Sequence, residues 1–311
     1  MPEPNDRELK VIDNTPCPAT KYKADFWEKK HGDSFVILRF FTSDVYYPEH
    51  WTPFSIKCAF KGDEYYKFPN TKYRVADNNF LLLNEGAMYE SFIKSEEKVE
   101  SFSINYSNEN LRQMFGALSK KAEKQLDNPF NSIAAPVRFM EKLYSKDNTA
   151  SRYIHSIRDL SLDMENNYEL IKENLFFLLE ELLFLQKEIS SEIDTIESKK
   201  RSTKEELYKR LYQAKDFIDS CYMSDIDLSD IAKASCLDPF YLLRKFKKFF
   251  RITPHQYLTQ IKIIDAKRML QNPNTSISEV SKELGFYDLS HFNRVFKRHT
   301  ALSPESYKKA V

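Results

Sequence analysis

The chain has 311 residues, of which 41% are hydrophobic and 14% aromatic, so it can bury the cores of two or three domains and is not a disordered protein. Its five glycines form no G-x-x-x-x-G-K-S/T or G-x-G-x-x-G motif, which argues against nucleotide-driven chemistry. The net charge of +1 divides unevenly, because residues 207–311 contain 18 Lys+Arg against 11 Asp+Glu, and this basic third predicts a polyanion-binding module.

Residues 1–106 are predicted to form an antiparallel β domain. Short aromatic and β-branched runs alternate there with turn residues, and such spacing is typical of a sandwich or a small barrel. The predicted strands are residues 35–41, 54–60, 65–68, 73–75, 80–83, 89–93 and 99–106.

Aromatic residues and two histidines are the candidate functional groups of this domain. The aromatic set has two interpretations, which are that it lines a ligand pocket or that it fills the interior of a barrel. Its members are Phe54, Tyr65, Tyr66, Tyr73, Phe80, Tyr89 and Phe92. His31 and His50 are predicted to be surface or core residues, because no H-x-H motif or distant glutamate completes a metal site. We therefore expect no metal, no cofactor and no catalytic residue here.

Residues 107–197 are predicted to be helical, with helices over 108–124, 137–144, 152–164 and about 169–197. In the last helix the apolar positions step by four and three residues, as in a coiled-coil seam. They are Ile171, Leu175, Leu178, Leu182, Leu185 and Ile189. We favour a dimerising helix over 169–197. The alternative is a helix packed within its own chain, since Phe176, Phe177, Leu179 and Leu183 widen the apolar stripe.

A charged, polar stretch over residues 198–206 predicts an interdomain linker. Ser202 or Thr203 is expected to cap the next helix, with Glu205 or Glu206 completing a capping box.

Residues 207–311 contain an internal repeat of a short helix, a turn and a basic-aromatic helix. The segment 228–233 matches 277–282 at an offset of 49, and 241–248 matches 291–298 at an offset of 50. The second copy therefore has one extra residue at its turn, as two helix-turn-helix units with different corners would. A helix from Pro254 to about Gln271, roughly 27 Å long, joins the units and could hold two helices about one turn of B-DNA apart, ~34 Å.

The corners and caps of the two units are predicted from single residues. Asp238, followed by Pro239, is expected to cap the second helix of the first unit, and Asp288 that of the second. Gly285 suits a corner that needs a positive φ, whereas Cys236 occupies the equivalent corner of the first unit, which is expected to be either strained or differently bent.

These segments resemble the AraC/XylS family of bacterial transcription regulators. The matching residues are 228–232, 238–247, 253–258, 266–270, 285–298 and 302–307, about one third of the chain. The resemblance implies that the first recognition helix presents Phe240, Leu243, Arg244 and Lys247 to DNA. It implies that the second presents Leu289, Ser290, Asn293, Arg294 and Lys297. Of these, Lys247 and Lys297 are expected nearer the phosphates, while Arg244 and Arg294 are expected to read bases.

The N-terminal region resembles the sensor domain of that family more loosely, because residues 56–62 and 80–86 fall where a cupin-like barrel has its early strands. The resemblance implies an α+β protein made of four parts. These are a cupin-like sensor barrel over 1–106, a helical, dimerising region over 107–197, a linker over 198–206 and a DNA-binding domain with two helix-turn-helix motifs over 207–311.

The expected function is therefore a sequence-specific, dimeric DNA-binding transcription regulator that responds to a small molecule or partner. Its expected partners are double-stranded DNA, a second copy of itself, an effector and, for an activator, RNA polymerase. Two other hypotheses are a cupin-type metal enzyme with an appended helical domain and an adaptor that does not need nucleic acid. We expect a soluble, cytoplasmic protein, since no signal peptide or membrane-spanning run is apparent in the sequence.

Overall fold

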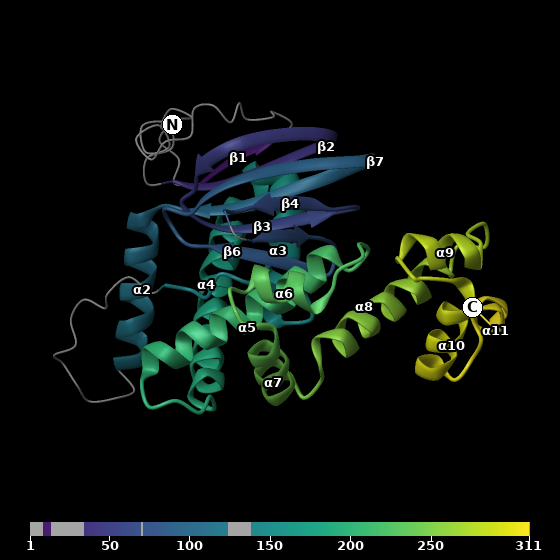
Figure 1. Cartoon of the computed structure of the whole chain (residues 1–311). Helices are drawn as coiled ribbons and strands as arrows, with labels where there is room; N and C mark the ends of the chain where they lie inside the picture. Colours follow the sequence, from purple (N-terminus) through teal and green to yellow (C-terminus); the bar gives the residue numbers. More distant parts are fainter. Residues whose placement is uncertain (1–8, 14–33, 70, 124–137, 311) are drawn as a thin grey trace. The chain divides into compact units, whose positions relative to one another are not determined.

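The computed structural model describes residues 9–13, 34–69, 71–123 and 138–310, which form two compact units, residues 1–197 and 198–311 (Figure 1). Among the predicted features, His31 and Lys124 lie outside the described residues.

The first unit is built on one sheet whose hydrogen-bonded strands run in the order β1-β2-β7-β3-β6-β8, with the β4–β5 hairpin attached to β7. The strands are β1 Leu9–Asp13, β2 Phe35–Trp51, β3 Phe54–Phe60, β4 Glu64–Lys67, β5 Lys72–Val75, β6 Asn79–Leu83, β7 Met88–Tyr106 and β8 Leu143–Ser145. The pairing is antiparallel except for β1, which joins β2 in parallel. The α+β class is confirmed, but the described strands follow an open path and do not close into the expected barrel.

Two strands are longer than the sequence predicted. β7 is continuous where strands over 89–93 and 99–106 were expected, and β2 extends to Trp51. The two pair along their length, with register shifts between Thr42 and Asp44 and between Tyr47 and His50. The charged middle of β7, residues 94–98, is exposed, so it lacks the alternation of apolar and polar residues that reveals a half-buried strand.

Within the described part of this unit, the α-helices are α2 Asn108–Glu123, α3 Thr149–Leu160 and α4 Met164–Asp194. Asn148 caps α3 and Asp163 caps α4, so α4 begins five residues before the predicted start. The Tyr106 hydroxyl donates a hydrogen bond to the Leu175 carbonyl, which ties β7 to α4.

The predicted seam of α4 is largely buried within its own unit. Its residues Ile171, Leu175, Leu178 and Leu182 are all 0% exposed, and Ile189 is 4% exposed. The structure therefore supports the alternative in which these side chains pack against the same chain. Any dimer contact of α4 must use its other face.

The predicted helix over 137–144 is wrong, because Leu143–Ser145 forms the edge strand β8, paired with Asn79–Leu81 of β6. Before this strand, the Asn84 side chain accepts a hydrogen bond from the Phe139 N–H and donates one to the Phe139 carbonyl. Residues 138–142 are thus held in non-helical conformation. Tertiary hydrogen bonding overrides the local helical pattern here.

A buried charge cluster lies where β2, β7 and α3 meet. Glu100 is 1% exposed, and its Oε1 lies 2.8 Å from Arg39 Nε. Arg158 Nε also donates to Oε1 at 3.0 Å, and its Nη2 donates to Oε2. The Arg158 guanidinium lies 4.2 Å from the centre of the Phe60 ring. Two arginines that are largely removed from water therefore share one carboxylate as their counter-charge.

The second unit is entirely helical. Its helices are α5 Arg201–Cys221, α6 Leu228–Ala234, α7 Pro239–Phe250, α8 Pro254–Met269, α9 Ile277–Glu283, α10 Leu289–Thr300 and α11 Pro304–Ala310. The expected linker is shorter than predicted, because residues 201–206 belong to α5, and Ser202 and Thr203 lie inside the helix instead of capping it. Within the described ranges, no helix is long and apolar enough to cross a membrane.

Candidate functional site

The first helix-turn-helix unit consists of α6 and α7. The Asp227 side chain caps α6 in a capping box, and the Asp238 side chain accepts hydrogen bonds from the Phe240 and Tyr241 N–H groups at the start of α7. Between the helices, the Leu237 N–H donates to the Ala232 carbonyl and the Cys236 N–H to the Lys233 carbonyl. This is a Schellman corner, with Cys236 at φ +52° in the position that favours glycine.

The second unit repeats this geometry. Ser276 caps α9 in a capping box, and Asp288 caps α10 through the His291 N–H. The Phe286 N–H donates to the Ser281 carbonyl and the Gly285 N–H to the Lys282 carbonyl. Four residues separate α6 from α7 and five separate α9 from α10, which confirms the predicted extra residue at the second turn.

Substitutions at the two corner residues are expected to change the free energy of unfolding in opposite directions. Cys236→Gly should stabilise the second unit by about 0.5–1 kcal/mol, because it relieves a left-handed conformation at an exposed side chain. Gly285→Ala should destabilise it by about 1–2 kcal/mol, because φ is +62° and a Cβ would lie 3.1 Å from the Met223 carbonyl oxygen. Urea unfolding followed by helical circular dichroism measures both changes.

Gly116→Ala is the matched control for Gly285→Ala, because Gly116 lies in α2 and a Cβ there would meet nothing within 4 Å. We expect this substitution to leave stability unchanged or to raise it slightly. Equal losses for the two alanine variants would show that the corner conformation is not the cause.

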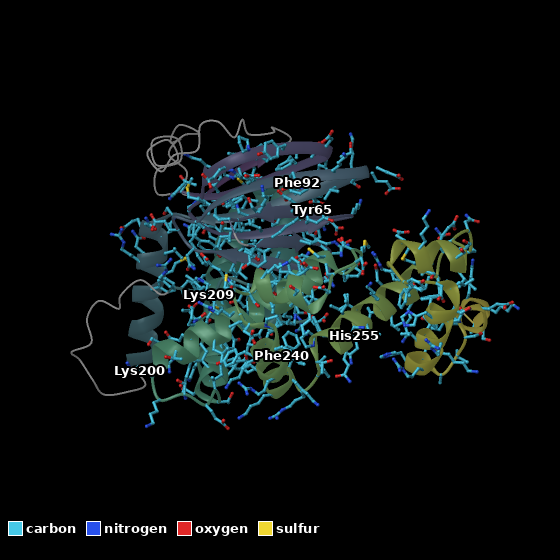
Figure 2. All side chains as sticks on the ribbon, in the orientation of Figure 1. Tyr65, Phe92, Lys200, Lys209, Phe240 and His255 are labelled. Carbon is cyan, nitrogen blue, oxygen red and sulfur yellow. The ribbon has the colours of Figure 1, made fainter. Side chains whose placement is uncertain are left out.

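The predicted DNA-contacting residues lie on the outer faces of α7 and α10. In α7 they are spaced by three and four residues, so they share one face of the helix. Phe240, labelled in Figure 2, is 82% exposed, and Leu243 is half-buried. The remaining seven residues are exposed, namely Arg244, Lys247, Leu289, Ser290, Asn293, Arg294 and Lys297. Neither helix contains an acidic residue.

The opposite faces of the same helices anchor them in the unit. Leu242 and Phe246 of α7 and Phe292 and Phe296 of α10 are 0% exposed. α8 contacts both α7 and α10, and its start is fixed by a capping box at Thr253. The Lys262 side chain of α8 also donates to the Gly285 carbonyl at 3.4 Å, which ties α8 to the second corner. Each outer face is therefore supported by packed aromatic residues.

A recess between the start of α8 and the end of α10 was not predicted. It measures about 370 Å³ and is lined by Ile252, His255, Gln256, Thr259, Gln260, Arg298 and His299. His255 is labelled in Figure 2. The residues come from two segments, 252–260 and 298–299, which are far apart in the sequence, so sequence spacing alone could not bring them together. Their side chains are mainly hydrogen-bond donors or cations, which suits an anion.

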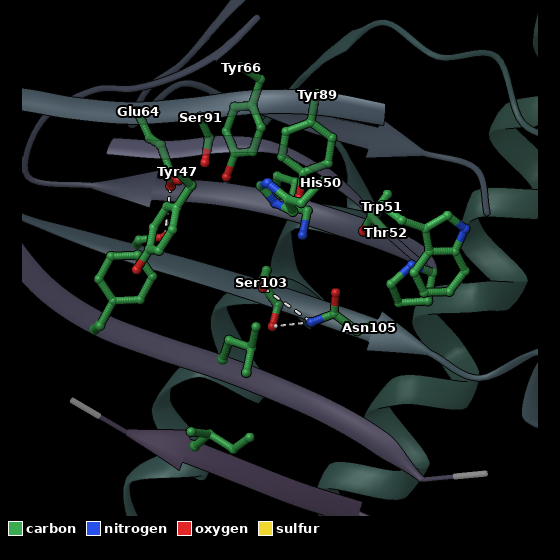
Figure 3. Close-up of a pocket in the computed structure, with 16 residues that line it drawn as sticks. Tyr47, His50, Trp51, Thr52, Glu64, Tyr66, Tyr89, Ser91, Ser103 and Asn105 are labelled. Carbon is green, nitrogen blue, oxygen red and sulfur yellow. Dashed lines mark hydrogen bonds between the residues drawn. The ribbon is translucent and has the colours of Figure 1, made fainter. Parts of the chain in front are cut away.

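The first unit has a separate pocket on one face of its sheet (Figure 3). It measures about 70 Å³, and its lining comes from β1, β2, β3, β4 and β7. Of the seven predicted aromatic residues, Tyr66 and Tyr89 line it. Phe54, Tyr73 and Phe80 are instead buried in the core, and Tyr65 stacks on Phe92 at 5.1 Å. The aromatic set is thus divided between the pocket lining and the core of an open sheet, and the ligand remains a prediction.

The polar residues of this pocket were not predicted from the sequence. Lys57 of β3 and Glu64 of β4 line it and are 6% and 3% exposed. A lysine within the apolar run Phe54–Phe60 was the available signal, because a lysine is almost never buried without a partner. His50 also lines the pocket, with its ring 4.4 Å from the Tyr89 ring. The described residues contain no cluster of three or more metal-binding side chains.

Comparisons with known proteins identify the second unit. A helix-turn-helix domain family model matches residues 231–310. The Msm operon regulatory protein of Streptococcus mutans is 33% identical over 99 residues, which cover 32% of this chain and 36% of that protein. The lactose operon transcription activator of Staphylococcus xylosus is 32% identical over 98 residues, which cover 32% of this chain and 35% of that protein. Residues 231–310 are an AraC-type helix-turn-helix domain.

The chain spans about a third of the length of the curated relatives that it matches. Among solved structures, the C-terminal domain of AraT, a response regulator from Geobacillus stearothermophilus, is similar at 25% identity. The aligned region covers 33% of this chain and 85% of the AraT domain, with a TM-score of 0.31. The sequence relatives match the AraC-type domain, and both are named as regulators.

Proposed function

We propose that the chain is a sequence-specific DNA-binding transcription regulator. The observation that carries the proposal is the repeated surface of the AraC-type domain, in which two capped helices present exposed basic and polar residues at equivalent positions. A major groove admits one helix, and arginine can bind the guanine edge through two hydrogen bonds. Arg244 and Arg294, one in each unit and both exposed, are the proposed base-reading arginines.

The proposed complex places α7 and α10 in consecutive major grooves. α8 has 16 residues and is about 24 Å long, so with the packing of the flanking helices it can hold them about one helical turn of DNA apart. The phosphate backbone between the grooves would then cross the recess that contains His255 and Arg298. Lys247 and Lys297 would supply attraction to phosphates that does not depend on sequence.

Selection of binding sites from a random DNA pool by the purified chain tests this function. We expect enrichment of two short motifs with centres about 10–10.5 base pairs apart for each bound chain. Binding to DNA without any enriched sequence would favour the adaptor hypothesis instead.

Ligand sensing is proposed for the first unit, and the pocket beside Lys57 and Glu64 supports it. A ligand there would contact strands β2, β3, β4 and β7 at once, so its binding could favour one arrangement of the sheet over another. If the regulator acts as an activator, RNA polymerase is a further partner.

We also propose that the chain dimerises through the outward face of α4. Leu170 and Phe184 are 46% and 57% exposed, and Phe177 lies between them at spacings of seven residues on each side. Phe177 is half-buried, with its ring stacked on Tyr153 of α3, so Leu170 and Phe184 are the exposed members of this stripe. Apolar residues at heptad spacing can pair with their copies in a second helix. This surface is distinct from the seam that is buried inside the unit.

Charging this stripe is expected to produce monomers. In the double variant Leu170→Glu and Phe184→Glu the dimer dissociation constant should rise at least about tenfold, since burial of each such side chain contributes about 1.5–3 kcal/mol. Sedimentation velocity over a concentration series measures the change. Leu162→Glu is the control, because Leu162 is 68% exposed but precedes α4. An unchanged dimer in the double variant would rule out this interface.

A further inference from the structure

The pocket of the first unit is lined by a lysine whose ammonium group has no hydrogen-bonding partner among the described residues. Lys57 is 6% exposed, and its Nζ makes no hydrogen bond or ion pair with any residue that the structure describes. The centre of the Tyr89 ring lies 5.7 Å from Nζ. Burial lowers the pKa of Lys57 to about 8, and the charge of Glu64 opposes this shift. An ammonium held in this way favours a ligand that can accept its hydrogen bonds.

The other polar groups of the pocket do not fill that role. Glu64 accepts a hydrogen bond from the Ser101 hydroxyl at 2.7 Å, and no ion pair joins it to Lys57 within the described residues. Burial raises the pKa of Glu64, while hydrogen bonds from Ser101 and Tyr66 lower it. The Asn105 side-chain amide donates to the Val36 carbonyl and to Ser103 Oγ. Glu64 and Asn105 each have hydrogen-bonding partners within the protein, so the ammonium of Lys57 remains the site for an incoming anion.

His50 adds no positive charge to this surface. Its Nδ1 lies 2.8 Å from the Pro48 carbonyl oxygen, and burial lowers its pKa to about 4, so the ring is neutral near pH 7. The pocket therefore offers one cation beside one carboxyl group. Glu64 would repel a doubly charged phosphate more strongly than a singly charged carboxylate, whose charge matches the single charge of Lys57.

The size and walls of the pocket limit the rest of the ligand. A space of about 70 Å³ holds roughly five water-sized groups, which excludes long chains from its enclosed part. Leu38, Phe40 and Tyr47 of β2 also line it. Figure 3 shows Tyr47, Tyr66 and Tyr89 around the same space. The walls thus suit a short apolar body attached to the anionic group.

We infer that this pocket binds a compact monocarboxylate, with the carboxylate on Lys57 Nζ and the body against the aromatic and aliphatic wall. The inference gives a chemical class to the effector and rests on the ligand-sensing role proposed above. Ligand binding can be measured in the absence of DNA. A chain that failed to bind DNA could therefore still bind the carboxylate. A chain that failed to bind the carboxylate would leave the proposed DNA-binding function of the AraC-type domain untouched.

Butyrate and its neutral isostere butyramide are the probes. Trp51 lines the pocket and is one of only two tryptophans in the chain, so Trp27→Phe leaves it as the single reporter. We expect butyrate to change Trp51 fluorescence saturably, with an affinity at least about tenfold higher than that of butyramide or inorganic phosphate. Equal affinity for acid and amide, preference for phosphate, or no saturable response to butyrate would overturn the inference.

Lys57→Met tests the assigned residue. This substitution should remove the preference for butyrate over butyramide. The melting temperature of the variant should be no lower than that of the parent, because a buried charge without an ion-pair partner is lost. Lys72→Met is the matched control, because Lys72 Nζ lies 4.2 Å from the centre of the Tyr65 ring and does not line the pocket. A preference for butyrate that persists in a folded Lys57→Met variant would also overturn the inference.

Discussion

Replacing Glu100 by glutamine is expected to lower the free energy of unfolding of the first unit by about 3–5 kcal/mol. The Glu100 carboxylate is 1% exposed and faces two arginines, whose side chains are 8% exposed for Arg39 and 20% for Arg158. Glutamine has nearly the same shape but no charge, so both guanidinium groups would remain buried without a counter-charge. Urea unfolding followed by tryptophan fluorescence reports on this unit, because Trp51 lies in β2 and both tryptophans precede residue 198.

Glu90→Gln provides the matched control on the same strand. Glu90 is 31% exposed and pairs with Lys67 at 3.3 Å, so its replacement should cost about 0–1 kcal/mol. Similar losses for Glu100→Gln and Glu90→Gln would mean that burial of the charge cluster does not determine its contribution.

Arg294→Ala is expected to weaken binding to the selected DNA site by about 1–3 kcal/mol and to relax base preference at one position. The reason is that an exposed arginine on the outer face of α10 can donate two hydrogen bonds to a guanine, which alanine cannot replace. Binding isotherms on the selected site and on substituted sites measure both effects. We expect the second unit, with its glycine corner, to supply more of the base discrimination than the first.

Lys247→Ala serves as the comparison, because Lys247 is exposed on α7 and is assigned to phosphate. It should lower affinity for all sequences alike and reduce the slope of log K against log salt by about one unit. An equal loss on specific and random DNA for Arg294→Ala would contradict its assignment as a base reader.

The second unit could be predicted closely from the sequence because its signals are local. Asp238, Pro239, Asp288 and Gly285 each satisfy a backbone requirement within a few residues, and each lies in the structure where its chemistry predicts. The corner at Cys236 was also recognisable, since the repeat aligns it with the turn that contains Gly285. The nine predicted contact residues share outer faces because helical periodicity fixes their directions.

The first unit was harder to predict because its determinants are not local. Leu143–Ser145 forms a strand only because β6, sixty residues earlier in the chain, offers an unpaired edge. Strand spacing predicted a sandwich or a small barrel but does not specify closure, and the cupin-like barrel was implied by the resemblance. The pocket joins residues of five strands, and the partners of Glu100 come from β2 and α3. Such groupings depend on register, which the sequence alone did not fix.

The most direct test of the proposed DNA-binding mode is methylation interference on the selected site, read separately for the parent, Arg244→Ala and Arg294→Ala. The account predicts two major-groove segments on one face of the DNA for each bound chain, with centres about 10–10.5 base pairs apart. Arg244→Ala should weaken interference in one segment and Arg294→Ala in the other. A single segment, or the same segment weakened by both substitutions, would contradict simultaneous docking of α7 and α10.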